Sequence, residues 1–345
     1  MNTQSTLCML ALALTTILSC SDDEATTVLP ETQDTLIELE FASSPINLQG
    51  VDALFAPDIA YDQYDKTTFD IFLPNSSSPT GLVIFIHGGG FTGGDKGFIY
   101  NENYDEQVVA LLSNDIAVAT LNYRLIETGD GEGVLKSLND SKRGLQYIRY
   151  IHNELNIDKN NIVLFGTSAG ASIALWLASN NDLREANSAD LVLQESTRVK
   201  GIALNATQSS LDIETRWLGD VFDEFGTSLD DIIQEVGAES VYSFYGATTQ
   251  EEYNTAEVEG YREQVDMLAL LSSDDPEIWV KNTGGHNNEP LTTGSFYHHP
   301  FHAREIKAFA DAAGVENIAV YGNPILFDDT NGEDFVAFLI RKISE

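Results

Sequence analysis

The sequence predicts an α/β fold with a mostly parallel central sheet and helices on both of its faces. Short apolar runs rich in β-branched residues alternate along the chain with amphipathic stretches, which is the pattern of parallel strands joined by crossover helices. Hydrophobic residues make up 43% of the 345 residues, enough to bury a large core. A chain of this length corresponds to one large α/β domain or two ordinary domains.

Residues 1–19 are predicted to be a lipoprotein signal peptide, and residues 20–45 a tether with an N-terminal strand. The apolar run at residues 7–18 is too short to span a bilayer and is followed by Ser19 and Cys20. This segment resembles a bacterial lipoprotein cleavage box, in which the cysteine becomes the acylated first residue. We therefore expect a lipid on Cys20, and the acidic residues 22–24 predict the outer surface of the outer membrane. An ordinary secretory signal with an incidental cysteine is the alternative.

The strands and helices of the remaining domain, residues 46–345, follow from hydrophobic patterning. The run of five apolar residues at 82–86 predicts a strand buried on both faces, in the middle of the sheet. Asp140 is expected to cap a helix whose apolar positions between 145 and 155 recur at helical spacing. Further strands are predicted at 67–73, 116–121, 161–165, 199–204, 278–280 and 317–321, and a closing helix at 334–343.

Residues 207–271 are acidic and aromatic, with weak periodicity. We expect them to form a helical cap inserted over the carboxyl edge of the sheet. Ordinary crossover helices packed on the sheet are the alternative.

Charge and cysteine content exclude several classes of function. The chain carries 18 Lys and Arg against 54 Asp and Glu, a formal charge of −36, so its surface repels nucleic acid. The two cysteines, Cys8 and Cys20, both precede the folded domain and provide neither a disulfide framework nor a thiolate metal site. The six histidines show no metal-ligand spacing, so no metal and no cofactor are expected.

A candidate nucleophile lies in the segment Gly166, Thr167, Ser168, Ala169, Gly170. A predicted strand runs directly into this segment and an apolar helix follows it, which places Ser168 on a tight turn. Side chains at the two glycines would collide with neighbouring backbone. The turn would present the Ser168 hydroxyl above the sheet and the Ala169 amide near the helix N-terminus, where it can stabilise an oxyanion.

A second motif, His87 followed by Gly88, Gly89 and Gly90, comes directly after the strand at 82–86. Glycines without side chains let backbone amides approach a substrate carbonyl. Gly88, Gly90 and Gly93 also match a dinucleotide-binding spacing. We reject that interpretation because residues 91–100 form an aromatic, glycine-containing loop rather than a helix, and because the acidic Asp115 precedes the next strand instead of ending it.

These motifs resemble the α/β-hydrolase fold, particularly bacterial esterases and carboxylesterases of the HGGG type. The resemblance rests on residues 83–96, 122–124 and 140–178, and with the later strands it extends over residues 67–344. It implies that Ser168 is the nucleophile, that Ala169 gives the first oxyanion amide and that Gly88 and Gly89 give the second. His87 would brace the loop. No cofactor is implied. Two substrate classes fit the predicted surface location, namely a small free ester and an ester-decorated carbohydrate.

The chain departs from this family where the base and the acid are expected. The family places its histidine after the last strand and its acid after the preceding one, but no histidine follows residue 321. Because mutual geometry defines a catalytic triad, a base from another loop can serve. Our first candidate is His299, our second His298 and our third His286. The alternative role of His298 and His299 is packing or capping at a helix start.

Asp212, which follows the strand at 199–204, is the candidate acid, with Glu289, Asp328 and Asp329 in reserve. Asp212 could instead be a turn or cap residue. The sequence therefore predicts a serine carboxylic-ester hydrolase acting through an acyl-enzyme, although amidases and peptidases share the same machinery. The alternative is a surface binding protein that keeps the fold but is catalytically impaired.

Overall fold

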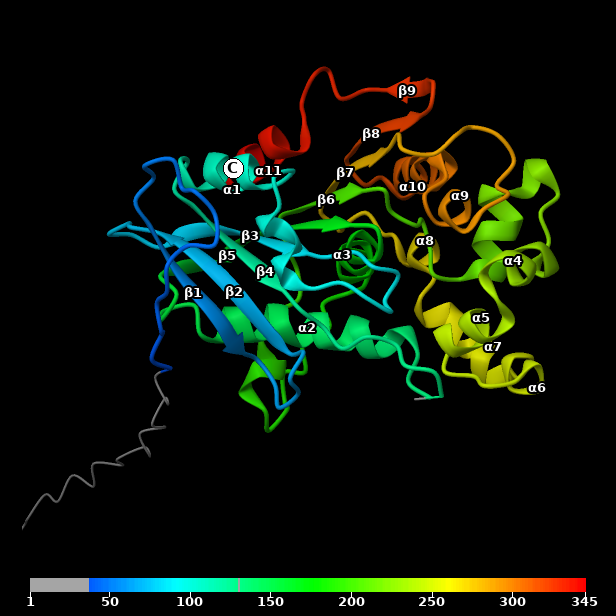
Figure 1. Ribbon diagram of the computed structural model, residues 1–345, viewed down its shortest axis with the longest axis horizontal. Helices are drawn as coiled ribbons and strands as arrows, with labels where there is room; N and C mark the ends of the chain where they lie inside the picture. The colour runs from blue at the N-terminus through cyan, green and yellow to red at the C-terminus, as the bar shows by residue number, and fades with distance from the viewer. Residues whose placement is uncertain (1–36, 130) are drawn as a thin grey trace, which may run out of the picture. The chain divides into compact units, whose positions relative to one another are not determined.

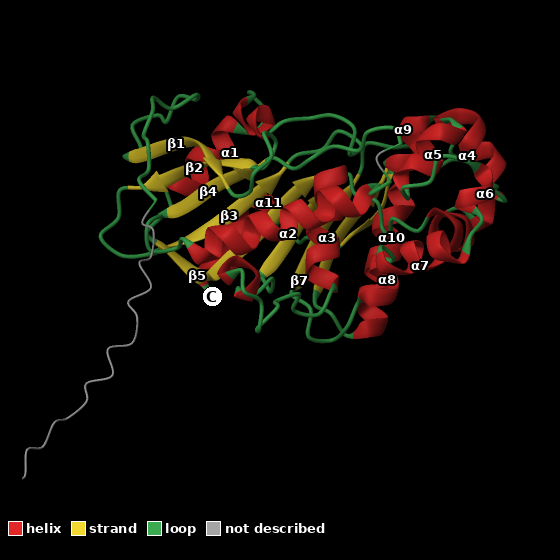
Figure 2. Ribbon diagram, turned by 90° about the horizontal axis from the view of Figure 1, so that it is seen from below, coloured by secondary structure: helices red, strands yellow, loops and turns green. Residues whose placement is uncertain are grey.

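The computed structural model describes residues 37–129 and 131–345, and in this part of the chain nine strands form a single sheet. Their order is β1-β2-β4-β3-β5-β6-β7-β8-β9, and the strands from β3 to β8 run parallel (Figures 1 and 2). The edge strands β1 and β9 pair antiparallel with their neighbours, and so does β2, which lies between β1 and β4. The predicted fold class is confirmed. The strands are β1 (Ala53–Ala60), β2 (Thr68–Pro74), β3 (Thr80–Ile86), β4 (Ile116–Leu121), β5 (Ile157–Thr167), β6 (Gly201–Asn205), β7 (Glu277–Asn282), β8 (Asn317–Gly322) and β9 (Ile325–Asp328).

Helices cover both faces of the sheet and bury its alternating side chains. Leu82 and Ile84 of β3 pack in a core with α2, α3 and α10, whereas Val83 and Phe85 face α1 and α11 on the other side. This arrangement explains why β3 is apolar throughout and lies mid-sheet, as predicted. The helices that cover the sheet are α1 (Asp105–Leu112), α2 (Val134–Tyr150), α3 (Ala169–Ser179), α10 (Pro300–Ala313) and α11 (Phe335–Ser344).

Two local predictions need correction. Asp140 lies inside α2, which begins at Val134, so it does not cap that helix. Its buried carboxylate instead binds Arg124 through the backbone amide at 2.9 Å, Nε at 2.8 Å and Nη2 at 2.7 Å, which ties the loop after β4 to α2. In the described part of residues 20–45, Ala42 forms only an isolated bridge with Phe55, and the first strand is β1. The predicted signal peptide and Cys20 lie outside the described residues.

Residues 213–270 are helical and connect β6 to β7. They lie at the end of the sheet away from β1 and β2 (Figure 1). Their aromatic side chains Trp217, Phe222, Tyr245 and Tyr253 are buried and belong to the same core cluster as one face of the sheet. We refer to residues 213–270 as the cap. Its elements are a π-helix η3 (Ile213–Val221), a short 3-10 turn η4 (Asp223–Phe225), α4 (Leu229–Val236), α5 (Ala238–Phe244), α6 (Gln250–Tyr253), α7 (Ala256–Gln264) and α8 (Met267–Leu270).

None of the helices in residues 37–129 and 131–345 combines the length and the apolar character that crossing a membrane requires.

Candidate active site

Ser168 lies at the corner where β5 passes directly into α3. Its backbone has φ 52° and ψ −120°, a strained conformation for a residue with a side chain. A Cβ atom at Gly166 would lie 2.3 Å from the carbonyl oxygen of Gly170, and one at Gly170 would lie 2.0 Å from that of Ile86. The turn packs directly against its own backbone and against β3, and this close packing requires glycine at both positions.

The start of α3 and the loop after β3 lie beside Ser168. Ala169 is the first residue of α3, and the amide of a first helical residue has no partner within its helix. The backbone of Gly88 packs against the serine, since a Cβ atom there would lie 3.1 Å from Cβ of Ser168. Gly89 has φ 122°, which favours glycine, and a Cβ atom there would meet the Gly93 carbonyl oxygen at 2.2 Å. The structure thus places the loop of Gly88 and Gly89 beside Ser168, where these amides can stabilise an oxyanion.

His87 braces this loop rather than acting on substrate. Its Nδ1 atom donates to the Gly88 carbonyl oxygen at 2.7 Å, and its ring stacks on Tyr123 with centroids 4.4 Å apart. The Tyr123 hydroxyl in turn donates to the His87 carbonyl oxygen at 2.8 Å. Burial lowers the pKa of His87, which keeps the ring neutral.

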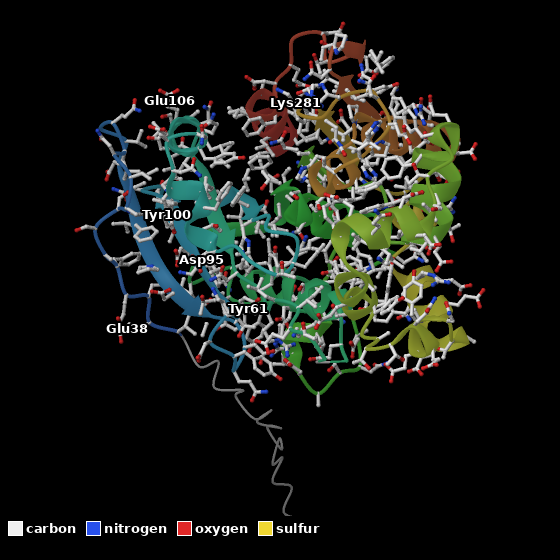
Figure 3. The ribbon with its side chains drawn as sticks, turned by 45° about the vertical axis from the view of Figure 1, so that its right-hand side comes forward. Glu38, Tyr61, Asp95, Tyr100, Glu106 and Lys281 are labelled. Carbon is white, nitrogen blue, oxygen red and sulfur yellow. The ribbon has the colours of Figure 1, made fainter. Side chains whose placement is uncertain are left out.

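The far end of the same loop, the 3-10 turn η1 (Lys96–Tyr100), is fixed to the sheet by a buried ion pair. Lys96 Nζ lies 2.7 Å from a carboxylate oxygen of Asp70 on β2 and 2.6 Å from one of Asp58. The Tyr100 hydroxyl also donates to Asp70, and Tyr100 lies beside the first strands of the sheet (Figure 3). The loop is therefore anchored at both ends, which gives its amides a fixed position.

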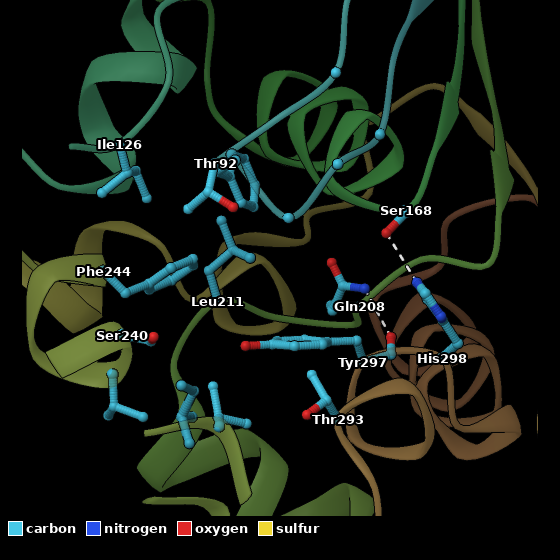
Figure 4. Close-up of a pocket in the computed structure, with 18 of the residues that line it drawn as sticks. Thr92, Ile126, Ser168, Gln208, Leu211, Ser240, Phe244, Thr293, Tyr297 and His298 are labelled. Carbon is cyan, nitrogen blue, oxygen red and sulfur yellow. Dashed lines mark hydrogen bonds between the residues drawn. The ribbon is translucent and has the colours of Figure 1, made fainter. Parts of the chain in front are cut away.

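The imidazole that faces the serine belongs to His298. Its Nε2 atom lies 2.9 Å from Ser168 Oγ (Figure 4). His298 directly follows α9 (Thr293–Tyr297) and lies in the turn before α10. Burial lowers its pKa, so the ring is neutral at neutral pH and can accept the serine proton.

His299, our first candidate, does not contact Ser168. The prediction that His299 rather than His298 is the base is therefore wrong. Its Nδ1 atom accepts from the Phe301 amide at 3.2 Å and caps α10, and its Nε2 atom donates to the Asn288 carbonyl oxygen at 2.9 Å. Both ring nitrogens are thus occupied in a fully buried, aromatic environment. The third candidate, His286, is exposed in the loop after β7.

Asp212, the predicted acid, also has another role. Its carboxylate accepts from the Thr215 amide at 3.1 Å, which caps η3, and lies 3.8 Å from Arg262 Nε. The Asp212 carboxylate therefore serves as the N-cap of η3 and does not orient His298, as the acid of a triad would. Among the described residues, none of the four predicted acids hydrogen-bonds to His298, because Asp328 binds Thr330, Asp329 binds the Ala319 amide and Lys307, and Glu289 is exposed.

Ser168 and His298 open into a pocket of about 770 Å³ between the loop after β3 and the cap (Figure 4). Apolar side chains dominate its wall, and among the described residues lining it there is one carboxylate, Glu239, and no Lys, Arg or Asp. Gln208 and Tyr297 also line the pocket. The sequence does not identify them as site residues, because neither belongs to a motif. Within residues 37–129 and 131–345, no group of three or more His, Cys, Asp or Glu side chains could hold a metal ion.

Parts of this chain are similar in sequence to known proteins. Residues 69–215 match the BD-FAE family model, which describes hydrolases of α/β-hydrolase fold. Acetylcholinesterase-1 of Trittame loki is 34% identical over 107 residues, which cover 28% of this chain and 18% of that protein. A probable isoprenylcysteine alpha-carbonyl methylesterase of Arabidopsis thaliana is 28% identical over 144 residues, covering 41% of this chain and 28% of that protein. The chain thus matches less than a third of the length of these relatives.

Among solved structures, a truncated carbohydrate esterase from gut microbiota superposes with a TM-score of 0.60 at 16% identity. The match covers 84% of this chain and 96% of that one. At this level of identity the likeness shows the fold alone. The chain therefore has the α/β-hydrolase fold that the resemblance implied.

Proposed function

We propose that this chain is a serine carboxylic-ester hydrolase that works through an acyl-enzyme. Ser168 Oγ attacks the ester carbonyl carbon while His298 Nε2 accepts its proton, and the amides of Ala169 and of Gly88 or Gly89 stabilise the oxyanion. The carbon–oxygen bond to the alcohol then breaks, and the imidazolium donates its proton to the departing alkoxide. Water attacks the acyl-serine in the same way, returns a proton to Oγ through His298 and releases the carboxylic acid.

The observation that carries this proposal is the 2.9 Å separation of Ser168 Oγ and His298 Nε2 at a strained strand-to-helix corner. The test is p-nitrophenol release from p-nitrophenyl acetate by the wild type, Ser168→Ala and His298→Ala, together with labelling by a fluorophosphonate. We expect both variants to lose kcat by about 10³-fold or more. We also expect the wild type, but not Ser168→Ala, to be labelled. Equal rates in all three proteins would show that this chain is not an esterase that uses Ser168 and His298.

The pocket favours uncharged esters with an apolar group. Its wall offers no cationic side chain among the described residues to pair with an anionic group, and Glu239 would repel one. Esters decorating polysaccharides have this character, and the structural neighbour named as a carbohydrate esterase supports the same class. Acetate release from an acetylated polysaccharide, compared with p-nitrophenyl acetate, tests this point. Activity only on the small ester would restrict the substrate to free esters.

A second candidate is a surface binding protein with impaired turnover. One observation favours it, namely that the predicted acid Asp212 caps η3 instead of contacting His298. The same comparison of wild type and Ser168→Ala separates the two functions, because a binding protein would show neither turnover nor fluorophosphonate labelling.

We further propose that the protein is lipid-anchored at the cell envelope through Cys20, on its outer-membrane surface. The support is the apolar run followed by Ser19, Cys20 and acidic residues. Metabolic labelling with an alkyne fatty acid should mark the wild type but not Cys20→Ala. Labelling of both proteins, or of neither, would contradict the anchor.

A further inference from the structure

The candidate base lies on a corner between two helices that side-chain hydrogen bonds hold in place. Three carbonyl groups of this corner, those of Phe296, Tyr297 and His299, each accept a hydrogen bond from a side chain elsewhere in the fold. His298 lies between the second and the third of them. Its position relative to Ser168 therefore depends on these three donors.

The buried segment 207–209, which follows β6, holds two of these donors and supplies the third. Asn282 Nδ2 donates to the His299 carbonyl oxygen at 3.2 Å and is itself paired with the backbone of Thr207. His302 Nε2 donates to the Phe296 carbonyl oxygen at 2.8 Å, while its Nδ1 atom accepts from Ser209. The third donor, Gln208, belongs to the segment itself.

Gln208 is the donor that connects the base to the nucleophile. Its Nε2 atom donates to the Tyr297 carbonyl oxygen at 2.7 Å (Figure 4). Its Oε1 atom accepts from Ser172 Oγ at 2.8 Å. Ser172 lies on the first turn of α3, where its amide donates to the Ser168 carbonyl oxygen at 3.0 Å. A continuous path of hydrogen bonds thus runs from the helix that carries Ser168 to the residue before His298.

We propose that Gln208 is a positioning residue that sets the distance between Ser168 Oγ and His298 Nε2. This inference rests on the proposed esterase function. Only a side chain that donates and accepts at the same time satisfies both the Tyr297 carbonyl and the Ser172 hydroxyl. An apolar side chain at position 208 does neither, and a carboxylate accepts from Ser172 but repels the Tyr297 carbonyl.

The experiment compares Gln208→Met with a matched control, Gln146→Met. Gln146 is also fully buried and donates to two backbone carbonyls, those of Leu193 at 3.2 Å and Glu195 at 2.8 Å, on α2 outside the pocket. We expect both variants to lower Tm. Only Gln208→Met should lower kcat, by about 10- to 100-fold, and the change in kcat should exceed any change in KM. Fluorophosphonate labelling of Ser168 should slow by the same factor.

Gln208→Glu gives a readout that a merely structural role would not move. Its carboxylate cannot donate to Tyr297 near neutral pH, but the protonated acid can. The kcat of Gln208→Glu relative to wild type should therefore rise as pH falls through the pKa of the new carboxyl group. Full kcat in Gln208→Met, or a ratio that does not change with pH, would overturn the inference. An inactive wild type would instead contradict the proposed function.

Discussion

Because α3 contacts β3 at Gly170, this glycine tolerates a side chain least among the glycines of the site. In Gly170→Ala the new Cβ atom would lie 2.0 Å from the Ile86 carbonyl oxygen and 2.6 Å from that of His87. An unstrained contact needs about 3.4 Å, so the start of α3 has to move from β3 by about 1 Å or more. Ser168 and Ala169 lie at that helix start and would move with it.

We expect Gly170→Ala to lower kcat by about 10²-fold, the usual effect of a misplacement of this size, and to lower the free energy of unfolding by about 1–3 kcal/mol. The assays are p-nitrophenyl acetate hydrolysis per labelled serine and urea unfolding. Gly260→Ala in α7 is the control, because a Cβ atom there has no neighbour within 4 Å. It should keep wild-type kcat and raise stability by at most about 1 kcal/mol. Wild-type kcat in Gly170→Ala would refute the close-packing argument.

Three other predictions follow from the same geometry. Because burial lowers the pKa of His298 and the neutral ring is the active form, kcat/KM should persist below pH 6.5 and fall only as pH drops through the lowered pKa; a midpoint above 6.5 in the pH–rate profile would contradict this. His299→Ala should lower the free energy of unfolding by about 2–4 kcal/mol, since it removes a buried cap, yet cost less than tenfold in kcat; a loss as large as that of His298→Ala would return the base role to His299. Asp140→Asn should destabilise the protein by about 1–3 kcal/mol in urea unfolding, because it weakens the hydrogen bonds of the buried Asp140 carboxylate to the partly exposed Arg124; an unchanged unfolding midpoint would show that this pair adds nothing to stability.

The sequence alone determined the features that depend on local backbone. A strand buried on both faces must be apolar at every position, so residues 82–86 predicted the centre of the sheet, and β3 lies there. A strained turn that touches its neighbours must have glycines, so Gly166 and Gly170 identified Ser168 as the corner residue. In both cases the physical requirement and the residues that meet it are adjacent in the chain.

Only the tertiary structure decided which imidazole faces Ser168. His298 and His299 are neighbours in sequence with the same chemistry, but 130 residues separate Ser168 from His298, and the packing of the turn between α9 and α10 points one ring at the serine and the other into the core. The role of Gln208 arises in the same way, because its partners Ser172 and Tyr297 meet only in the folded chain. Distances between remote side chains result from the sum of many packing contacts, and no short pattern of residues encodes that sum.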